Sequence, residues 1–322
     1  MGLFDKPRKI ADVYTKLRNQ ALSLEPVQIG LKPDQSNPIY GILMETGYKD
    51  AVVTLSAIGD GSVSLYFSNG GGIIGLGQHE EPRKACFSFL SFANQFSSHL
   101  QPTKEFSLPK KGFTAFYFLT INGVLTLTAK EADLGNNRHP LSPLFHRGQE
   151  VITQARFIDE KRRKDFQELM HSATTGDVQA IKKLIESGAN PDTSDPTGLT
   201  PLMAASHSGK VEILDVLLNA GVSIDTKDSS GYTALMFSCN AGQLSCARFL
   251  IEKGANVNEV DNDGSTPIMF CSQHGYNEIV RVLLNKGADP RVKGNHGLSA
   301  IGFAEQNGLA ETKRILEGVD GA

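Results

Sequence analysis

The chain has 322 residues, a net charge of −3 at pH 7 and 40% hydrophobic residues. This length predicts at least two domains, because a single hydrophobic core rarely serves more than about 250–300 residues. The sequence contains no run of about 18 apolar residues, the length needed to span a bilayer. The net charge is +1 for residues 1–160 and −4 for residues 161–322. Neither half is therefore as basic as a nucleic-acid binder. We therefore expect neither a nucleic-acid nor a membrane partner.

The N-terminus and the cysteines indicate the compartment. Residues 1–9 are charged but lack the apolar segment and cleavage site of a secretory signal, so we expect a cytoplasmic protein. The cysteines Cys86, Cys239, Cys246 and Cys271 lack the paired spacing of a metal site. We interpret them as small core residues in a reducing compartment.

The first predicted element is an amphipathic helix over residues 7–23, where Ile10, Tyr14 and Leu17 recur at helical spacing. Residues 25–38 contain three prolines and no periodicity, which predicts a connecting loop.

Two β-hairpins are predicted next. Residues 53–57 and 63–67 alternate apolar and polar side chains around Asp60-Gly61, and residues 113–121 and 124–129 flank Asn122-Gly123. Both dipeptides tolerate the positive φ angles of tight hairpin turns, so each pair of runs should form antiparallel strands.

Helices are expected between and after the hairpins. Residues 82–100 show an apolar face at helical spacing, and a last helix should begin with Ser142 as its cap and Pro143 in its first turn. The order predicts an α+β domain over residues 1–160, with an antiparallel sheet and helices packed on it. In element order it is similar to profilin-like or roadblock-like folds.

A glycine-rich stretch follows the first hairpin. Gly70, Gly72 and Gly75 satisfy a bare G-x-G-x-x-G pattern, whose backbone amides could hold a phosphate. However, the preceding strand belongs to a hairpin rather than a βαβ unit, and no acidic residue between Glu81 and Glu105 is available to bind a ribose. We interpret Gly70–Gly77 as a bend, and keep a nucleotide- or small-molecule-dependent activity there as the alternative.

Two histidine-containing clusters are the remaining candidates for chemistry. His79-Glu80-Glu81, and Arg138-His139 with His146, both lack the helical two-histidine spacing of a zinc hydrolase, and no nucleophile motif accompanies them. We therefore expect no enzyme activity, no catalytic residue, no metal and no cofactor.

The second half of the chain repeats a phrase every 33 residues. The copies begin at Asp195, Asp228 and Asp261 and read, for example, Asp-Pro-Thr-Gly-Leu-Thr-Pro-Leu-Met, and a worn fourth copy ends at Gly302. Two ladders of glycines share the step: Gly176, Gly209, Gly242, Gly275 and Gly308, and Gly188, Gly221, Gly254 and Gly287. This period resembles the ankyrin-repeat family over residues 163–322.

The resemblance implies an all-α solenoid of about five units in a domain over residues 161–322. In each unit a turn is followed by two short helices, and the hydroxyls of Thr200, Thr233, Thr266 and Ser299 should cap the first helices. The family's frequent histidine in this phrase is replaced by Met203, Met236, Met269 and Gly302, and a methionine can fill that space.

The resemblance also implies protein recognition on a concave surface of loop tips and first helices. Our candidate partner-binding residues are Leu199, His207, Lys227, Tyr232, Asn240, Asn262, Asp263, Gln273, His274, His296 and Leu298. Tyr232 is the expected anchor, as an exposed rigid ring. Phe237, Phe270 and Phe303 also recur every 33 residues; we favour packing between units over an exposed stripe.

Together these patterns predict a non-enzymatic adaptor that binds a protein partner. One concrete form would be a bacterial protein that neutralises or chaperones an effector or toxin.

Overall fold

The computed structural model describes residues 7–30, 39–69, 72–73 and 75–318, with side chains from residue 12 onward. The chain divides into two compact units, which we call unit 1 (Met1–Glu160) and unit 2 (Lys161–Ala322). Two residues named in the sequence predictions lie outside this description. The side chain of Ile10 in the predicted first helix is not described, and neither is Gly70 of the glycine-rich stretch.

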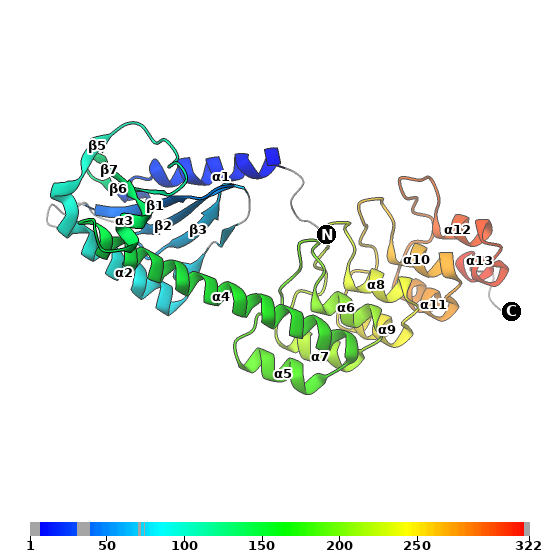
Figure 1. Cartoon of the computed structure of the whole chain (residues 1–322). Helices are drawn as coiled ribbons and strands as arrows, with labels where there is room; N and C mark the ends of the chain where they lie inside the picture. Colours follow the sequence, from blue (N-terminus) through cyan, green and yellow to red (C-terminus); the bar gives the residue numbers. More distant parts are fainter. Residues whose placement is uncertain (1–6, 31–38, 70–71, 74, 319–322) are drawn as a thin grey trace. The chain divides into compact units, whose positions relative to one another are not determined.

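Unit 1 contains both helices and strands (Figure 1). Its elements are α1 (Pro7–Leu22), η1 (Pro26–Ile29), β1 (Ile39–Gly47), β2 (Val52–Ile58), β3 (Val63–Phe67), β4 (Gly72–Ile73), η2 (Leu76–Gln78), α2 (Glu80–Ala93), η3 (Asn94–His99), β5 (Gln101–Thr103), β6 (Phe113–Thr120), β7 (Gly123–Lys130) and α3 (Glu131–Gly135), where η marks a 3₁₀ helix.

The strands form one antiparallel sheet in the order β4-β3-β2-β1-β6-β7-β5. The two predicted hairpins are confirmed as β2–β3 and β6–β7. The strand that joins them, β1, was not among the predicted elements. It is the centre of the sheet and is buried along almost its whole length, so it lacks the alternation that indicates a half-exposed strand.

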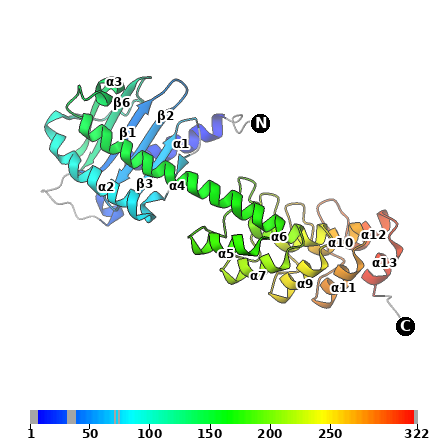
Figure 2. The same ribbon diagram turned by 60° about the horizontal axis from the view of Figure 1, so that its bottom comes forward.

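Helices cover both faces of this sheet. On one face Phe89 of α2 and Val151 of α4 (Ser142–Thr175) belong to the larger core, together with Phe116 of β6. On the other face Leu22 of α1 packs with Tyr117 in a smaller core. Figure 2 shows α2 and α4 crossing the front of the sheet. The expected antiparallel sheet with packed helices is therefore confirmed, whereas the profilin-like or roadblock-like topology stays a prediction.

Two helix boundaries differ from the expected ones. The predicted helix over 82–100 ends as an α-helix at Ala93 and continues as the 3₁₀ helix η3. Ser142 is the first helical residue of α4, and its hydroxyl donates to the Asp133 carbonyl oxygen at 3.4 Å instead of capping the helix.

Unit 2 is a stack of helix pairs. They are the C-terminal part of α4 with α5 (Val178–Glu186), α6 (Pro201–His207) with α7 (Val211–Asn219), α8 (Ala234–Asn240) with α9 (Leu244–Glu252), α10 (Pro267–His274) with α11 (Asn277–Asn285), and α12 (Ala300–Gln306) with α13 (Ala310–Leu316).

The helices of unit 2 lie in two layers, and a loop projects before each first helix (Figure 1). The first helices α6, α8, α10 and α12 lie side by side in one layer, and the second helices α5, α7, α9, α11 and α13 form the other. One continuous core runs between them, because each helix pair buries its apolar side chains only against its neighbours. Cys239, Cys246 and Cys271 belong to this core and Cys86 to the larger core of unit 1, in agreement with their expected role as core residues.

The first helices are capped as expected in all but one case. The hydroxyls of Thr200, Thr233 and Ser299 accept the backbone N–H three residues later at 3.3 Å. Thr266 does not cap its helix, because the Met269 N–H donates to the Thr266 carbonyl oxygen at 3.0 Å instead. Its buried hydroxyl has no hydrogen-bond partner among the described residues.

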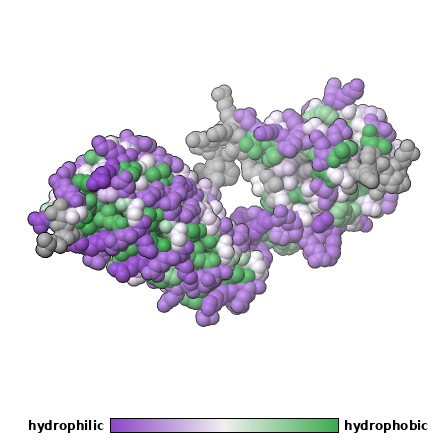
Figure 3. All heavy atoms as spheres, turned by 180° about the vertical axis from the view of Figure 1, so that it is seen from behind, coloured by the Kyte–Doolittle hydropathy of each residue, from purple (hydrophilic) through white to green (hydrophobic). Residues whose placement is uncertain are grey.

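No helix in the described ranges is long and apolar enough to cross a membrane. On the face shown in Figure 3, hydrophilic and hydrophobic residues are interspersed over the surface.

Candidate partner-binding site

The tips of the repeat loops are built around one aspartate each. Asp195, Asp228 and Asp261 direct Oδ1 at the backbone N–H groups two and four residues later, at 2.7 to 3.0 Å. These bonds close each tip into a compact turn. Burial opposes the charge of Asp195, but hydrogen bonds from Thr197 and from nearby backbone N–H groups lower its pKa.

Neighbouring tips are joined by a ladder of hydrogen bonds. The N–H groups of Ser229, Asn262 and Asn295 donate to carbonyl oxygens in the preceding tip at 2.7 to 3.0 Å. The side-chain amides of Asn262 and Asn295 add a second set, donating to the carbonyl oxygens of Ser229 and Asn262 at 2.9 and 3.1 Å. We call these bonds the tip ladder; they make the tips one continuous surface.

The fourth tip departs from this plan. Gly294 stands where the other tips have aspartate, and a Cβ there would lie 2.8 Å from Nδ1 of His296. The His296 ring therefore takes the space of the missing side chain. It also lies against Phe303 of α12, with ring centroids 5.0 Å apart.

Three aromatic side chains meet beside the second and third tips. The Tyr232 ring lies edge-to-face with Phe237 of α8 at 5.9 Å and with Phe270 of α10 at 5.2 Å between centroids. All three are half-buried. We call Tyr232, Phe237 and Phe270 the ring cluster; it brings two neighbouring repeats to one point on the surface of tips and first helices.

Three carboxylates act on the Tyr232 hydroxyl of the ring cluster. Burial raises the pKa of the Tyr232 hydroxyl, and the carboxylates of Asp261, Asp263 and Asp228 raise it further. The neighbouring Lys227 does not offset them, because its Nζ lies 2.7 Å from Glu259 and donates to the Val260 carbonyl oxygen at 2.8 Å.

The structure corrects the expected exposure of Tyr232 and shows which neighbours Asn262 and Lys227 contact, while the part of all three residues in binding stays a prediction. Tyr232 is not an exposed ring, because Phe237 and Phe270 flank it. Asn262 is exposed, but its amide belongs to the tip ladder. Lys227 likewise joins neighbouring repeats through Glu259 rather than standing free.

The other candidates differ in their exposure and in their neighbours. The exposed histidines pack their rings on aromatic neighbours: His207 on Phe237 at 6.3 Å and His274 on Tyr276 at 5.5 Å. The remaining side chains are either exposed, as in Asn240, Asp263 and Gln273, or half-buried, as in Leu199 and Leu298. Their part in binding stays a prediction.

The sequence pattern predicts packing for Phe237 and Phe270 and does not link them to Tyr232. They do pack against the repeat core, as does Phe303, and this agrees with the favoured interpretation. Two features of the sequence could have placed the three rings together. Phe237 and Phe270 occupy the same position in neighbouring repeats, and Tyr232 lies five residues before Phe237.

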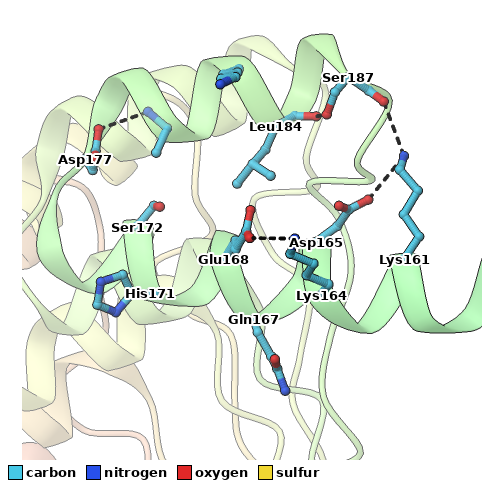
Figure 4. Close-up of a pocket in the computed structure, with 12 residues that line it drawn as sticks. Lys161, Lys164, Asp165, Gln167, Glu168, His171, Ser172, Asp177, Leu184 and Ser187 are labelled. Carbon is cyan, nitrogen blue, oxygen red and sulfur yellow. Dashed lines mark hydrogen bonds and ion pairs between the residues drawn. The ribbon is translucent and has the colours of Figure 1, made fainter.

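A cavity of about 690 Å³ lies between the C-terminal part of α4 and α5 (Figure 4). Two of the three lysines that line it are paired with acidic neighbours: Lys161 lies 3.5 Å from Asp165, and Lys164 lies 3.9 Å from Glu168. Because basic and acidic side chains alternate around it, the cavity favours neither an anion nor a cation.

A smaller cavity, of about 340 Å³, lies in unit 1 beside Gly75 and Gly77, with Arg83 in its lining. A Cβ at Gly77 would clash with the Gly61 carbonyl oxygen, so this glycine serves the close approach of η2 to the β2–β3 turn. Among the described residues, no group of three or more His, Cys, Asp or Glu side chains could hold a metal ion.

Comparison with known families identifies the repeats. A family model described as ankyrin repeats (3 copies) matches residues 169–261, 221–294 and 254–317, and residues 1–168 have no such match. Residues 169–317 therefore belong to the ankyrin-repeat family, whose members generally bind other proteins. The count of five units stays a prediction. No curated protein matches the chain.

Proposed function

We propose that the protein is a non-enzymatic, cytoplasmic adaptor that holds a protein partner on the surface formed by its repeat tips and first helices. The ring cluster carries this proposal. It places three half-buried rings from two repeats on a surface whose backbone is already fixed by the tip ladder. Aromatic anchors on a rigid surface supply contact area at a small cost in conformational entropy.

A pull-down with the full chain tests the proposal. The double variant Tyr232→Ala/Leu199→Ala should lose partner recovery. The matched control is Glu212→Ala/Arg248→Ala, which changes two exposed residues on the second-helix layer and should leave recovery unchanged. Equal recovery by wild type and the Tyr232/Leu199 variant would remove the assigned surface.

The narrower prediction, that the partner is a bacterial effector or toxin which the protein neutralises, has a direct test. Affinity purification from the native host followed by mass spectrometry should recover a toxic or secreted protein, and co-expression should relieve its toxicity. Recovery of a housekeeping enzyme instead would contradict this prediction and leave the adaptor role in place.

A second candidate function is binding of a nucleotide or small molecule at the described part of the Gly70–Gly77 stretch. The cavity lined by Gly75, Gly77 and Arg83 supports it, because a guanidinium is a good phosphate ligand. Asp60 in the same lining and the acidic first turn of α2, Glu80 and Glu81, oppose an anion there. We therefore prefer the adaptor function.

Thermal shift with a nucleotide panel distinguishes the two functions, since a ligand bound by the native state raises the melting temperature. The suitable variant is Arg83→Gln. Gly72→Val is unsuitable, because a Cβ at Gly72 would lie 2.7 Å from the Leu65 carbonyl oxygen and disturb the sheet. A nucleotide-dependent shift that Arg83→Gln abolishes would establish the second function; no shift at millimolar ligand would remove it.

A further inference from the structure

The ring cluster has the features of a site for a cation. Its rings are held at steep angles, with Tyr232 inclined by 77° to Phe237 and by 73° to Phe270. All three side chains are half-buried; Phe237 and Phe270 pack against the repeat core, and Tyr232 lies against both of them. The face of an aromatic ring carries negative charge and attracts ammonium and guanidinium groups.

The carboxylates around the cluster have no counter-cation of their own. Among the described residues, no ion pair involves Asp228, Asp261 or Asp263. Asp228 and Asp261 are fixed by the backbone N–H groups of their own turns. The carboxylate of Asp263 is exposed and can therefore attract a cation that approaches the rings.

The charge of the whole repeat array has the same sign. Residues 161–322 contain 20 acidic and 16 basic side chains. Such an excess attracts a positively charged partner and disfavours an acidic one, and the effect weakens as salt is added.

We infer that the ring cluster receives an arginine or lysine side chain from a basic segment of the protein partner, with the cation over the rings of Phe237 and Phe270 and beside Asp263. This inference rests on the proposed adaptor function and names the chemistry of the partner.

A random peptide library displayed on phage and selected on the full-length protein provides the probe. Selected peptides should be enriched in arginine and lysine over the input library. A synthetic copy of the best peptide should bind in a fluorescence polarisation assay, more weakly as salt rises, and should lose affinity when its key arginine is replaced by citrulline, which keeps the shape and removes the charge.

Variants of the protein locate the contact. Phe270→Leu keeps an apolar side chain but removes the ring, and should weaken peptide binding about two- to five-fold, the range expected of an exposed cation–π contact. Asp263→Asn should weaken binding and reduce its salt dependence. Glu252→Gln, which removes an exposed carboxylate on α9, is the matched control and should leave both unchanged. Thermal unfolding checks that each variant is folded.

Three results would overturn the inference: no enriched peptide, enriched peptides without basic residues, or a basic peptide bound equally by Asp263→Asn and Glu252→Gln. The pull-down described above separates such a failure from failure of the adaptor function. If partner recovery still depends on Tyr232 and Leu199, the surface binds a protein of other chemistry.

Discussion

A buried ion pair joins α1 to the centre of the sheet. The Arg18 guanidinium donates to both carboxylate oxygens of Glu45 at 2.7 and 2.8 Å, and the Glu45 side chain is fully buried. Thr54 donates to the same carboxylate, and its hydroxyl lies 2.8 Å from that of Tyr14. Removal of either Arg18 or Glu45 would leave a buried charge without a partner, so substitutions in this network should lower the stability of the protein.

Tyr14 should make the stability of the protein depend on pH in the alkaline range. Burial, and then the charge of Glu45, raise the pKa of its hydroxyl to about 12 from 10.0. The folded state thus keeps this proton more tightly than the unfolded state. The resulting stability is fully present below pH 10.0 and is lost as the pH rises through about 12, by up to about 3 kcal/mol.

The variant Tyr14→Phe tests this. At pH 8 it should be less stable by about 1 kcal/mol, because it loses the hydrogen bond to Thr54. Between pH 9 and pH 11.5 its free energy of unfolding, measured in urea, should fall less steeply than that of wild type. Parallel curves for the two proteins would show that Tyr14 keeps an ordinary pKa.

The cysteines should be unreactive in the folded protein. Burial raises the pKa of Cys86 to about 12 and that of Cys246 to about 11, and it also raises that of Cys271. Since the thiolate is the reactive form, Ellman's reagent at pH 8 should detect almost no thiol in the native protein and 4 in denaturant. Rapid release of one equivalent from the native protein would contradict this.

At the scale of the element, two equivalent helix starts offer a matched comparison. Thr233→Val removes a capping hydroxyl and should cost about 1 kcal/mol. Thr266→Val removes a buried hydroxyl without a partner and should change the stability by less than about 0.5 kcal/mol, or increase it. The free energies of unfolding in urea decide between them, and an equal loss for both would show that Thr266 caps α10.

The sequence predicted those elements whose signal is local. The hairpin turns and the 33-residue phrase specify their own conformations, so β2–β3, β6–β7 and the repeat helices followed from them. The strand β1 could not be found in this way: it is buried on both faces and carries Glu45, whose partner Arg18 lies 27 residues away.

The candidate site was predictable only in outline. The tips were located by their phrase, but the roles of single tip residues depend on the neighbouring repeat. Asn262 bonds to Ser229, and Tyr232 packs on Phe270, 38 residues later. Such contacts appear only when adjacent units are stacked.

At the scale of the whole molecule, we propose that each unit folds by itself. The core of unit 1 includes residues of α4 up to Ala155, and the core of unit 2 begins with Leu169. The helix between them contains no buried residue from 156 to 168. Apart from Ile158, which packs against the core of unit 1, no hydrophobic side chain of this segment contacts either core, so the segment couples the two cores weakly.

Separate expression of residues 1–160 and 161–322 tests this proposal. Each protein should give a cooperative thermal transition by circular dichroism, and the full chain should reproduce the two transitions. A fragment that is unfolded alone but folded in the full chain would show that its unit depends on the other for stability.

The tip ladder also bears on how the array could change in length during evolution. The side-chain rung from Asn295 to Asn262 and the one from Asn262 to Ser229 each join positions 33 residues apart. Duplication or loss of 33 residues within the array would leave each hydrogen bond of the tip ladder with an equivalent partner. An insertion of any other length would put the tips out of register. The array can therefore grow or shrink by whole blocks while the N-terminal unit stays unchanged.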